Sequence, residues 1–117
     1  MTAHAVVRGV APIFPVCELN AALESYGRLG FTVRRYAGGD DGYAALGPAE
    51  IHLGVAPAGV AHGSAHLFVD DADLLARAWA AVGADVRAPE DTTWRRREGV
   101  LIDPAGSVIR FRSILGG

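Results

Sequence analysis

Lysine is absent from the 117-residue chain, cysteine occurs once, and there is no long hydrophobic run. The single cysteine, Cys17, excludes an intramolecular disulfide and a zinc site built from several cysteines. All apolar runs fall well short of the roughly 20 residues that a membrane-spanning helix needs. The N-terminal segment also lacks the basic stretch and apolar core of a secretory signal. We therefore expect a cytoplasmic protein without a membrane partner.

The charged residues are nearly balanced and give no sign of a polyanionic partner. With 11 basic and 13 acidic residues the formal net charge is −2, which provides no basic footprint for nucleic acid. The sequence contains no glycine-rich phosphate loop, no Ser-His-Asp order and no paired zinc-ligand spacing. Hydrophobic residues make up 50% of the chain, enough for a packed core at a length typical of one domain. The composition thus favours a single globular domain that does not bind nucleic acid.

An internal repeat is the most informative feature that the chain does contain. The segment VCELNAALESYGRLG at 16–30 corresponds to the segment VDDADLLARAWAAVG at 69–83. The offset is 53 residues, as from Val16 to Val69, and it stays constant along the segment. A repeat of this size predicts one supersecondary module that is used twice.

Each copy of the repeat begins with a predicted strand and continues with a predicted helix. The apolar runs at 5–16 and 64–69 are typical of strands. Both helices are expected to end at a glycine in the left-handed region, Gly30 and Gly83. Apolar residues fall at helical spacing along each predicted helix: Leu19, Ala22, Leu23, Tyr26 and Leu29, then Leu74, Leu75, Ala78, Trp79 and Val82.

Polar residues mark the helix starts and the last turn. Asp71 or Asp73 would cap the second helix, whereas Glu18 is a poorer cap for the first. The sequence Asp-Pro-Ala-Gly at 103–106 is a type I turn signal, with proline at the second position and glycine at the fourth.

Three further strands are expected after each helix, which gives the fold class. The sequence predicts an α+β protein of two β-α-β-β-β modules, at 5–56 and 64–114, joined by a linker at 57–63 that is rich in proline, glycine and alanine. The modules are expected to form a curved mixed sheet with a concave cleft. The predicted strands after the helices are 31–36, 42–46 and 50–55, then 85–88, 97–102 and 107–113.

Alternation along the strands predicts which side chains face away from the helices. In the strand at 64–69, Leu67 would pack on the helices while His66 and Phe68 point away. His52 and Arg110 point away in their own strands, between apolar neighbours that pack inwards. These outward positions have no packing reason for their polarity, and we expect them to line the concave side.

The modules and their motifs resemble the vicinal oxygen chelate superfamily, which includes glyoxalase I, extradiol dioxygenases, fosfomycin resistance enzymes and the bleomycin resistance proteins. The shared motifs are Val-x-x-Leu at the start of the first helix, Leu-Gly-Phe at its end and the Asp-Pro-x-Gly turn. The segments at 28–31, 94–98 and 103–111 are most similar to the bleomycin resistance branch. The resemblance covers nearly the whole chain.

The resemblance also says where a metal would be held. Enzymes of the superfamily bind a divalent ion with His and Glu at four equivalent strand positions, which correspond here to Ala11, His52, Ser64 and Arg110. Alanine has no donor atom, serine is a poor lone ligand, and arginine is a permanent cation. Because only His52 is suited to coordination, we expect no metal, no other cofactor and no glyoxalase or dioxygenase chemistry.

In the bleomycin resistance branch, two subunits hold a drug in clefts at their interface, and aromatic side chains stack on its flat groups. The resemblance therefore implies a homodimer and a small aromatic-bearing ligand, such as a glycopeptide antibiotic. Tyr36, Tyr43 and Trp94 are the matching cleft aromatics. Tyr26 and Trp79 lie instead on the apolar faces of the helices and are expected in the core.

Several polar residues have two interpretations. His52 and His66 either contact the ligand or lie on a wet face. Arg110 either binds a carboxylate or a carbamoyl oxygen of the ligand or pairs with Glu50. The Asp-Asp pair at 40–41 either reaches a cationic ligand group or belongs to a solvated turn, and the three arginines at 95–97 would discourage a polycation.

The sequence thus predicts a metal-independent small-molecule-binding protein that sequesters an antibiotic in the style of bleomycin resistance. The alternatives are an atypical enzyme of the same superfamily, lyase-like or dioxygenase-like, and a small-molecule sensor or accessory subunit. The sequence does not name the ligand or say whether strands are exchanged between subunits. The predicted ligand-binding residues are Trp94, Tyr43, Tyr36, His52, His66, Arg110 and Phe68.

Overall fold

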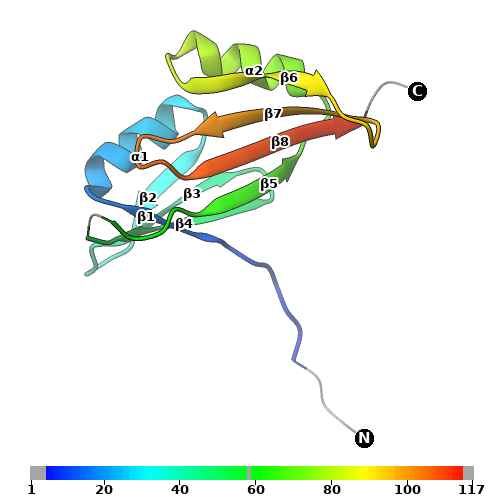
Figure 1. Ribbon diagram of the computed structural model, residues 1–117. Coiled ribbons are helices and arrows are strands. Elements are labelled where there is room, and N and C mark those ends of the chain that lie inside the picture. The colour runs from blue at the N-terminus through cyan, green and yellow to red at the C-terminus, as the bar shows by residue number, and fades with distance from the viewer. Residues whose placement is uncertain (1–4, 58, 115–117) are drawn as a thin grey trace, which may run out of the picture.

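The chain folds as two β-α-β-β-β modules (Figure 1). The computed structural model describes residues 5–57 and 59–114, so residue 58 of the predicted linker lies outside the described part. The first module consists of β1 (Ile13–Val16), α1 (Leu19–Arg28), β2 (Thr32–Arg35), β3 (Gly42–Leu46) and β4 (Ala49–Val55). The second consists of β5 (Ser64–Phe68), α2 (Ala72–Ala81), β6 (Asp85–Asp91), β7 (Arg96–Ile102) and β8 (Val108–Ile114).

Each module forms its own four-stranded mixed sheet, and the two sheets have the same topology. The strand orders are β1-β4-β3-β2 and β5-β8-β7-β6. In both sheets the strand before the helix pairs in parallel with the last strand, and the other pairs are antiparallel. A parallel pair needs a long crossover, which the helix and the two middle strands provide. The predicted α+β class and the two modules are confirmed.

The helix ends follow the predicted signals with one difference. Asp71 caps α2, because its side chain accepts a hydrogen bond from Leu74 N at 3.0 Å. Glu18 was expected to be a poorer cap, yet its carboxylate accepts from the backbone N–H groups of Asn20 and Ala21. The longer side chain folds back over the first turn and satisfies two amides. The glycines that follow the helices have φ of 97° at 30 and 83° at 83, as predicted.

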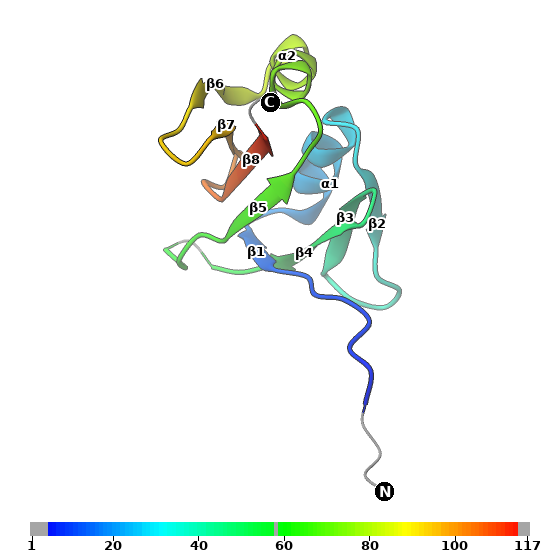
Figure 2. The ribbon, with the colours of Figure 1, turned by 90° about the vertical axis from the view of Figure 1, so that its right-hand side faces the viewer.

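The first strand is much shorter than the predicted run at 5–16. Pairing starts only at Ile13, and residues 5–12 leave the body as an extended arm (Figures 1 and 2). Pro12 has no N–H to donate to a ladder. The apolar side chains of the arm find no surface to cover on their own chain, so Val6, Val7 and Val10 are 74–89% exposed.

The strand β6 is longer than predicted and continues to Asp91 rather than ending near residue 88. Its pairing register with β7 shifts between Arg87 and Glu90. This irregularity contains Pro89, whose missing N–H is tolerated at a bulge. The ladder is therefore interrupted at Pro89, and the strand continues beyond it.

The core joins the two modules through aromatic side chains of both helices. Trp79 of α2 is 1% exposed, contacts Phe111 edge-on at 5.2 Å between ring centroids, and stacks on Phe31 at 6.3 Å. Its indole N–H donates a 2.8 Å hydrogen bond to the carbonyl of Leu29 at the end of α1. Tyr26 is also 1% exposed, so the predicted core roles of Tyr26 and Trp79 are confirmed.

Tyr26 ties α1 to the turn between β7 and β8. Its hydroxyl donates a 2.8 Å hydrogen bond to Asp103 Oδ2, while Asp103 Oδ1 accepts from the N–H groups of Ala105 and Ser107. Gly106 N donates to Asp103 O at 2.9 Å, as expected for the predicted turn. Burial raises the pKa of the Tyr26 phenol above its usual range, and the neighbouring Asp103 carboxylate raises it further.

Removal of this buried hydroxyl is expected to destabilise the fold. Tyr26→Phe leaves the carboxylate of Asp103, which is 6% exposed, without its side-chain donor. We expect a loss of about 2 kcal/mol in the free energy of unfolding, measured by urea denaturation. Tyr36→Phe is the matched control and should change stability by less than about 0.5 kcal/mol, since Tyr36 is exposed. Equal stability of the two variants would show that the buried bond contributes nothing.

Neither helix is long and apolar enough to cross a membrane in the part of the chain that the structure describes.

Candidate functional site

One face of each sheet packs on the helices, and the opposite side, called here the outer face, carries the predicted site residues. Ile51 and Leu53 of β4 are buried while His52 between them is half-buried. Ile109 and Phe111 of β8 are fully buried while Arg110 between them is exposed. The alternation predicted for these strands is confirmed, and it places polar side chains on both outer faces.

The pairing registers show which outer-face positions of the two modules correspond. In the first sheet the row across the strands is Arg34, Tyr43, His52 and Ile13. In the second sheet the equivalent row is Arg87, Val100, Arg110 and His66. Tyr43 of the first sheet thus corresponds to Val100 of the second, and His52 corresponds to Arg110. The two outer faces therefore offer different chemistry to a ligand.

Three predicted residues form a cluster on the first sheet. The ring of Tyr36 stacks on His52 at 5.5 Å between centroids, and it packs against Tyr43 at the same distance and a tilt of 39°. Tyr43 and His52 are direct cross-strand partners in β3 and β4. Tyr36 follows β2 and reaches the other two from the start of the loop that leads to β3. The rings of Tyr36, Tyr43 and His52 therefore hold one another in place.

Asp41 belongs to this cluster as well, although the sequence did not single it out from the turn at 40–41. Its Oδ2 lies 3.3 Å from His52 Nε2, and its Oδ1 accepts a hydrogen bond from Val55 N at 3.2 Å. The carboxylate thus fixes the orientation of the imidazole. The pairing register of β3 and β4 explains this position of Asp41. Gly42 lies opposite Leu53, so the preceding residue, Asp41, lies beside the end of β4.

A second cluster lies on the outer face of the second sheet and forms what we call the basic hollow. It has a volume of about 310 Å³ and is lined by Phe68, Val69, Trp94, Arg96, Arg112, Ser113 and Ile114. The guanidinium of Arg112 lies over the ring of Phe68, 4.8 Å from its centroid. Trp94 and Phe68 are 57% and 75% exposed, so neither ring is used by the core.

The loop between β6 and β7 holds Trp94 in place. The backbone N–H of Thr92 donates to Arg96 O at 2.8 Å, and Thr92 Oγ1 accepts from Arg96 N at 3.0 Å. Arg95 adopts a φ of 62°, which is rare for a residue with a side chain. This tight closure turns the chain so that Trp94 stands beside β8.

His66 and Arg110 belong to neither cluster. They are cross-strand partners in β5 and β8, one pair away from Phe68 and Arg112. Arg110 lines a separate hollow of about 370 Å³ together with Glu90 and Glu98. The predicted alternative of an ion pair between Arg110 and Glu50 is not formed within residues 5–57 and 59–114.

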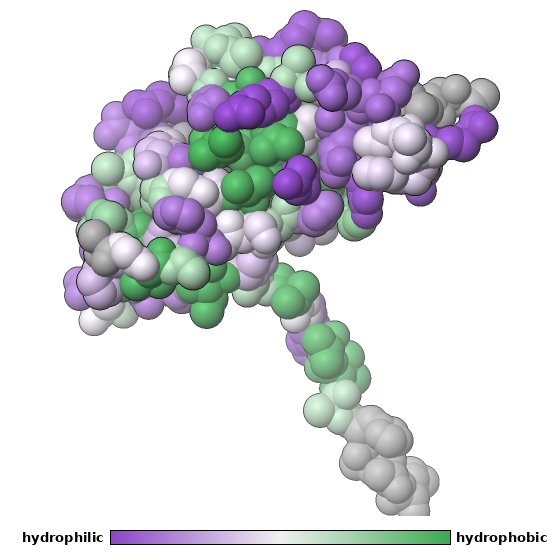
Figure 3. Space-filling model, in the orientation of Figure 1, coloured by the Kyte–Doolittle hydropathy of each residue, from purple (hydrophilic) through white to green (hydrophobic). Residues whose placement is uncertain are grey.

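An apolar patch extends the outer face of the second sheet beyond Arg110. Val100, Ile102 and Val108 are half-buried, and they share this face because Val100 pairs with Arg110 and Ile102 pairs with Val108. Figure 3 shows hydrophobic surface over β7 and β8 with hydrophilic side chains around it. The second sheet thus offers an apolar region and a basic aromatic region side by side.

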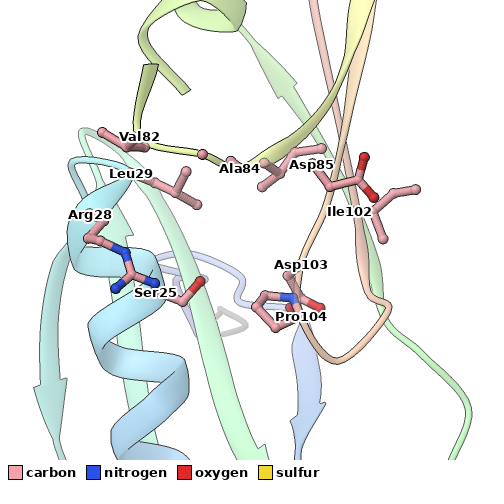
Figure 4. Close-up of a pocket in the computed structure, with 11 residues that line it drawn as sticks. Ser25, Arg28, Leu29, Val82, Ala84, Asp85, Ile102, Asp103 and Pro104 are labelled. Atoms are coloured by element: carbon pink, nitrogen blue, oxygen red, sulfur yellow. The ribbon is translucent and has the colours of Figure 1, made fainter. Parts of the chain in front are cut away.

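A larger pocket lies near the helix ends, and none of the predicted residues lines it. It has a volume of about 390 Å³ and lies between the end of α1, the turn after α2 and the turn at 103–106 (Figure 4). Its charged groups are already engaged, since Arg28 pairs with Glu24 at 3.3 Å and Asp103 binds Tyr26. We therefore place the candidate site on the outer faces rather than here.

The residues at the superfamily's metal positions do not fit a metal. Arg110 occupies the position equivalent to His52, and Ser64 pairs with Val108 rather than with a histidine or a carboxylate. Across the described residues, no three His, Cys, Asp or Glu side chains are grouped so that they could hold an ion. Of the superfamily's four metal positions, all within the described residues, only that of His52 carries a side chain suited to coordination.

Neither a protein-family model nor a curated protein matches this sequence, so the comparisons rest on solved structures. A bleomycin resistance determinant encoded on the transposon Tn5 matches with a TM-score of 0.82 and 22% identity, over 92% of this chain and 98% of that one. A bleomycin-binding protein complexed with bleomycin matches with a TM-score of 0.78 and 22% identity, over 95% and 100% of the two chains. A glyoxalase-related enzyme from Clostridium phytofermentans matches with a TM-score of 0.80 and 18% identity, over 95% and 98%. The chain has the fold of the bleomycin resistance and glyoxalase-related proteins, that of the vicinal oxygen chelate superfamily.

Proposed function

We propose that this protein binds a small planar molecule without a metal and sequesters it, as a bleomycin-binding protein does with its antibiotic. The observation that carries the proposal is the exposed Trp94 beside Phe68 and Arg112 in the basic hollow. Large aromatic side chains are seldom left exposed together on a protein surface without a binding role. Stacking on such rings gives a planar ligand much contact area at a small cost in side-chain entropy.

The same surface supports a homodimer. Ile13, Phe68 and Ile114 on the outer faces are 67–75% exposed, and the arm at 5–12 adds further apolar side chains. A second copy related by a two-fold axis would cover them, and it would bring the outer face of one sheet towards that of another. Ligand contacts would then come from both the tyrosine–histidine cluster and the basic hollow.

Light scattering tests the dimer. The expected mass at micromolar concentration is twice the 12.2 kDa of one chain. Val7→Asp in the arm should shift the equilibrium towards the monomer if the arm contributes to the contact, because the buried carboxylate would be unpaired. A parent protein that scatters as a single chain would contradict the proposal.

Tryptophan fluorescence tests binding, because the two tryptophans lie in different environments. Trp79 is buried and Trp94 is exposed, so a stacked ligand should quench mainly Trp94. We expect saturable quenching, in buffer with chelator, by metal-free bleomycin or by a member of a panel of planar compounds. The matched variant Trp94→Phe should lose the quenching while it keeps the buried signal. Quenching that needs added metal, or that persists in Trp94→Phe, would contradict the proposal.

The second candidate function is an enzyme that works without a metal. It is favoured by the contact between His52 and Asp41, since a carboxylate that orients an imidazole is suited to general-base catalysis. Recovery of the bound compound separates the two functions. A sequestering protein returns the compound chemically unchanged after long incubation, whereas an enzyme converts it and loses the conversion in His52→Gln.

A further inference from the structure

We propose that the ligand is a planar acid, whose anionic group binds Arg96 and Arg112 while its ring system lies against Trp94 and Phe68. This inference rests on the proposed function of the basic hollow and names the class of compound that the hollow would take. Some arginines of the chain form ion pairs with carboxylates, whereas Arg96 and Arg112 in the hollow do not within the described residues.

Three arginines of the described residues have a carboxylate within 4.0 Å. Arg97 is held by two carboxylates, with Asp73 and Asp91 each 3.1 Å away. Hydrogen bonds from Arg97 lower the pKa of the Asp73 carboxyl below its usual range, as expected for a formed ion pair. Arg28 and Arg87 are paired as well, at 3.3 and 4.0 Å.

The two arginines of the basic hollow differ from these. Strand alternation sends Arg96 to the face opposite Arg97, and neither Arg96 nor Arg112 has a carboxylate within 4.0 Å in the described part of the chain. Arg96 donates to the carbonyl of Arg95, at 3.2 Å. Glu98 stands opposite Arg112 in the ladder but forms no ion pair with it. Two guanidinium groups therefore share one hollow, and neither has a carboxylate at ion-pair distance among the described residues.

Arg112 is held in place although its charge is not matched. Its guanidinium lies on the Phe68 ring, and its Nε atom is buried without a hydrogen-bond acceptor among the described residues. A buried donor without an acceptor is costly and rare in native proteins. An anionic group that enters the hollow would balance this charge and accept from the guanidinium edge.

The lining of the hollow selects both parts of such a ligand. No acidic side chain lines it, whereas Trp94, Phe68 and Ile114 provide an apolar wall next to the two arginines. A guanidinium binds a carboxylate, sulfonate or phosphate through paired hydrogen bonds, and nearby apolar walls strengthen that attraction. A polycation would meet like charge instead, which argues against a ligand with a basic tail.

The test uses three probes with one ring system and different charges: 2-naphthoate, 2-naphthamide and 2-naphthylmethylamine. Affinities are measured by calorimetry with the full chain at low ionic strength. We expect 2-naphthoate to bind about tenfold more tightly than the amide, and the cationic amine to bind least. The advantage of the acid should decrease as salt is added.

Matched arginine variants assign the effect to the hollow. Arg112→Gln and Arg96→Gln should each remove most of the advantage of the acid over the amide. Arg77→Gln, at an exposed arginine on α2 that does not line the hollow, removes the same charge and should behave as the parent. Having both Arg96 and Arg112 variants keeps the test valid if one of them folds poorly.

The outcomes separate this inference from the proposed function. Equal binding of acid and amide, with both weakened by Trp94→Ala, would overturn the acid preference and leave planar binding intact. Tighter binding of the amine would overturn it as well. No binding of any of the three probes would contradict both the inference and the function on which it rests.

Discussion

Trp79→Ala is expected to lower the free energy of unfolding by about 3–5 kcal/mol. The indole is 1% exposed and packs between Phe31 and Phe111, so its removal leaves a cavity at the centre of the core. The substitution also leaves the carbonyl of Leu29 without the 2.8 Å hydrogen bond that joins α2 to the end of α1. Both losses fall on the contact between the two modules.

Urea and thermal denaturation measure this effect. A loss of this size corresponds to a decrease in melting temperature of about 10–20 °C for a chain of this length. Leu74→Ala is the matched control on the same helix, because Leu74 is 57% exposed and its truncation should cost less than about 1 kcal/mol. If Trp79→Ala and Leu74→Ala have the same melting temperature, Trp79 does not join the two modules in a common core.

Trp94→Ala is expected to show the opposite behaviour. Truncation of a stacked aromatic anchor costs about 2 kcal/mol or more of binding, or roughly 30-fold in affinity. The side chain is 57% exposed and is held by the loop rather than by the core, so the melting temperature should barely change. Trp94→Phe keeps an aromatic ring at this position and should retain most of the affinity.

Calorimetric titrations with the planar probes measure this change in affinity, because the variant lacks the tryptophan whose fluorescence would report binding. Unchanged affinity in Trp94→Ala would show that the ligand does not use the basic hollow. A strong decrease in stability would show that Trp94 is a structural residue after all. The same substitution of tryptophan by alanine should thus lower stability at position 79 and ligand affinity at position 94.

The modules could be predicted from the sequence because the repeat and the strand alternation are local patterns. The offset from Tyr26 to Trp79 places equivalent residues on both helices, and both are buried. The alternation around His52 and Arg110 gave the outward direction of both side chains. These features depend only on the spacing of apolar and polar residues along the chain, which can be read directly from the sequence.

The errors arose where a backbone detail outweighs the local pattern. The apolar run at 5–16 reads as one strand, yet its first part has no sheet to join on this chain. The predicted strand at 85–88 stops before Pro89, yet a bulge accommodates this proline and β6 continues to Asp91. The length of an edge strand depends on partners that lie elsewhere, which residues 5–16 do not reveal.

The sequence gives candidate site residues but does not show how they are arranged. Tyr36, Tyr43 and His52 meet on the first sheet, whereas Trp94 and Phe68 meet on the second. No hydrogen bond, ion pair or aromatic contact joins the two clusters within the described residues. The direction of the Trp94 side chain depends on the backbone of its loop, where Arg95 has a positive φ. The spacing of residues in the sequence does not predict that conformation.

Native mass spectrometry of freshly purified protein, prepared without chelator, tests the central claim of metal-independent binding most directly. It reports the subunit number, any bound metal and any retained small molecule in one spectrum. The account predicts a species of two chains that carries no stoichiometric metal and that gains the mass of an added planar ligand without one. A stoichiometric zinc, nickel, manganese or iron ion that survives dialysis, or ligand binding that appears only with such an ion, would contradict it.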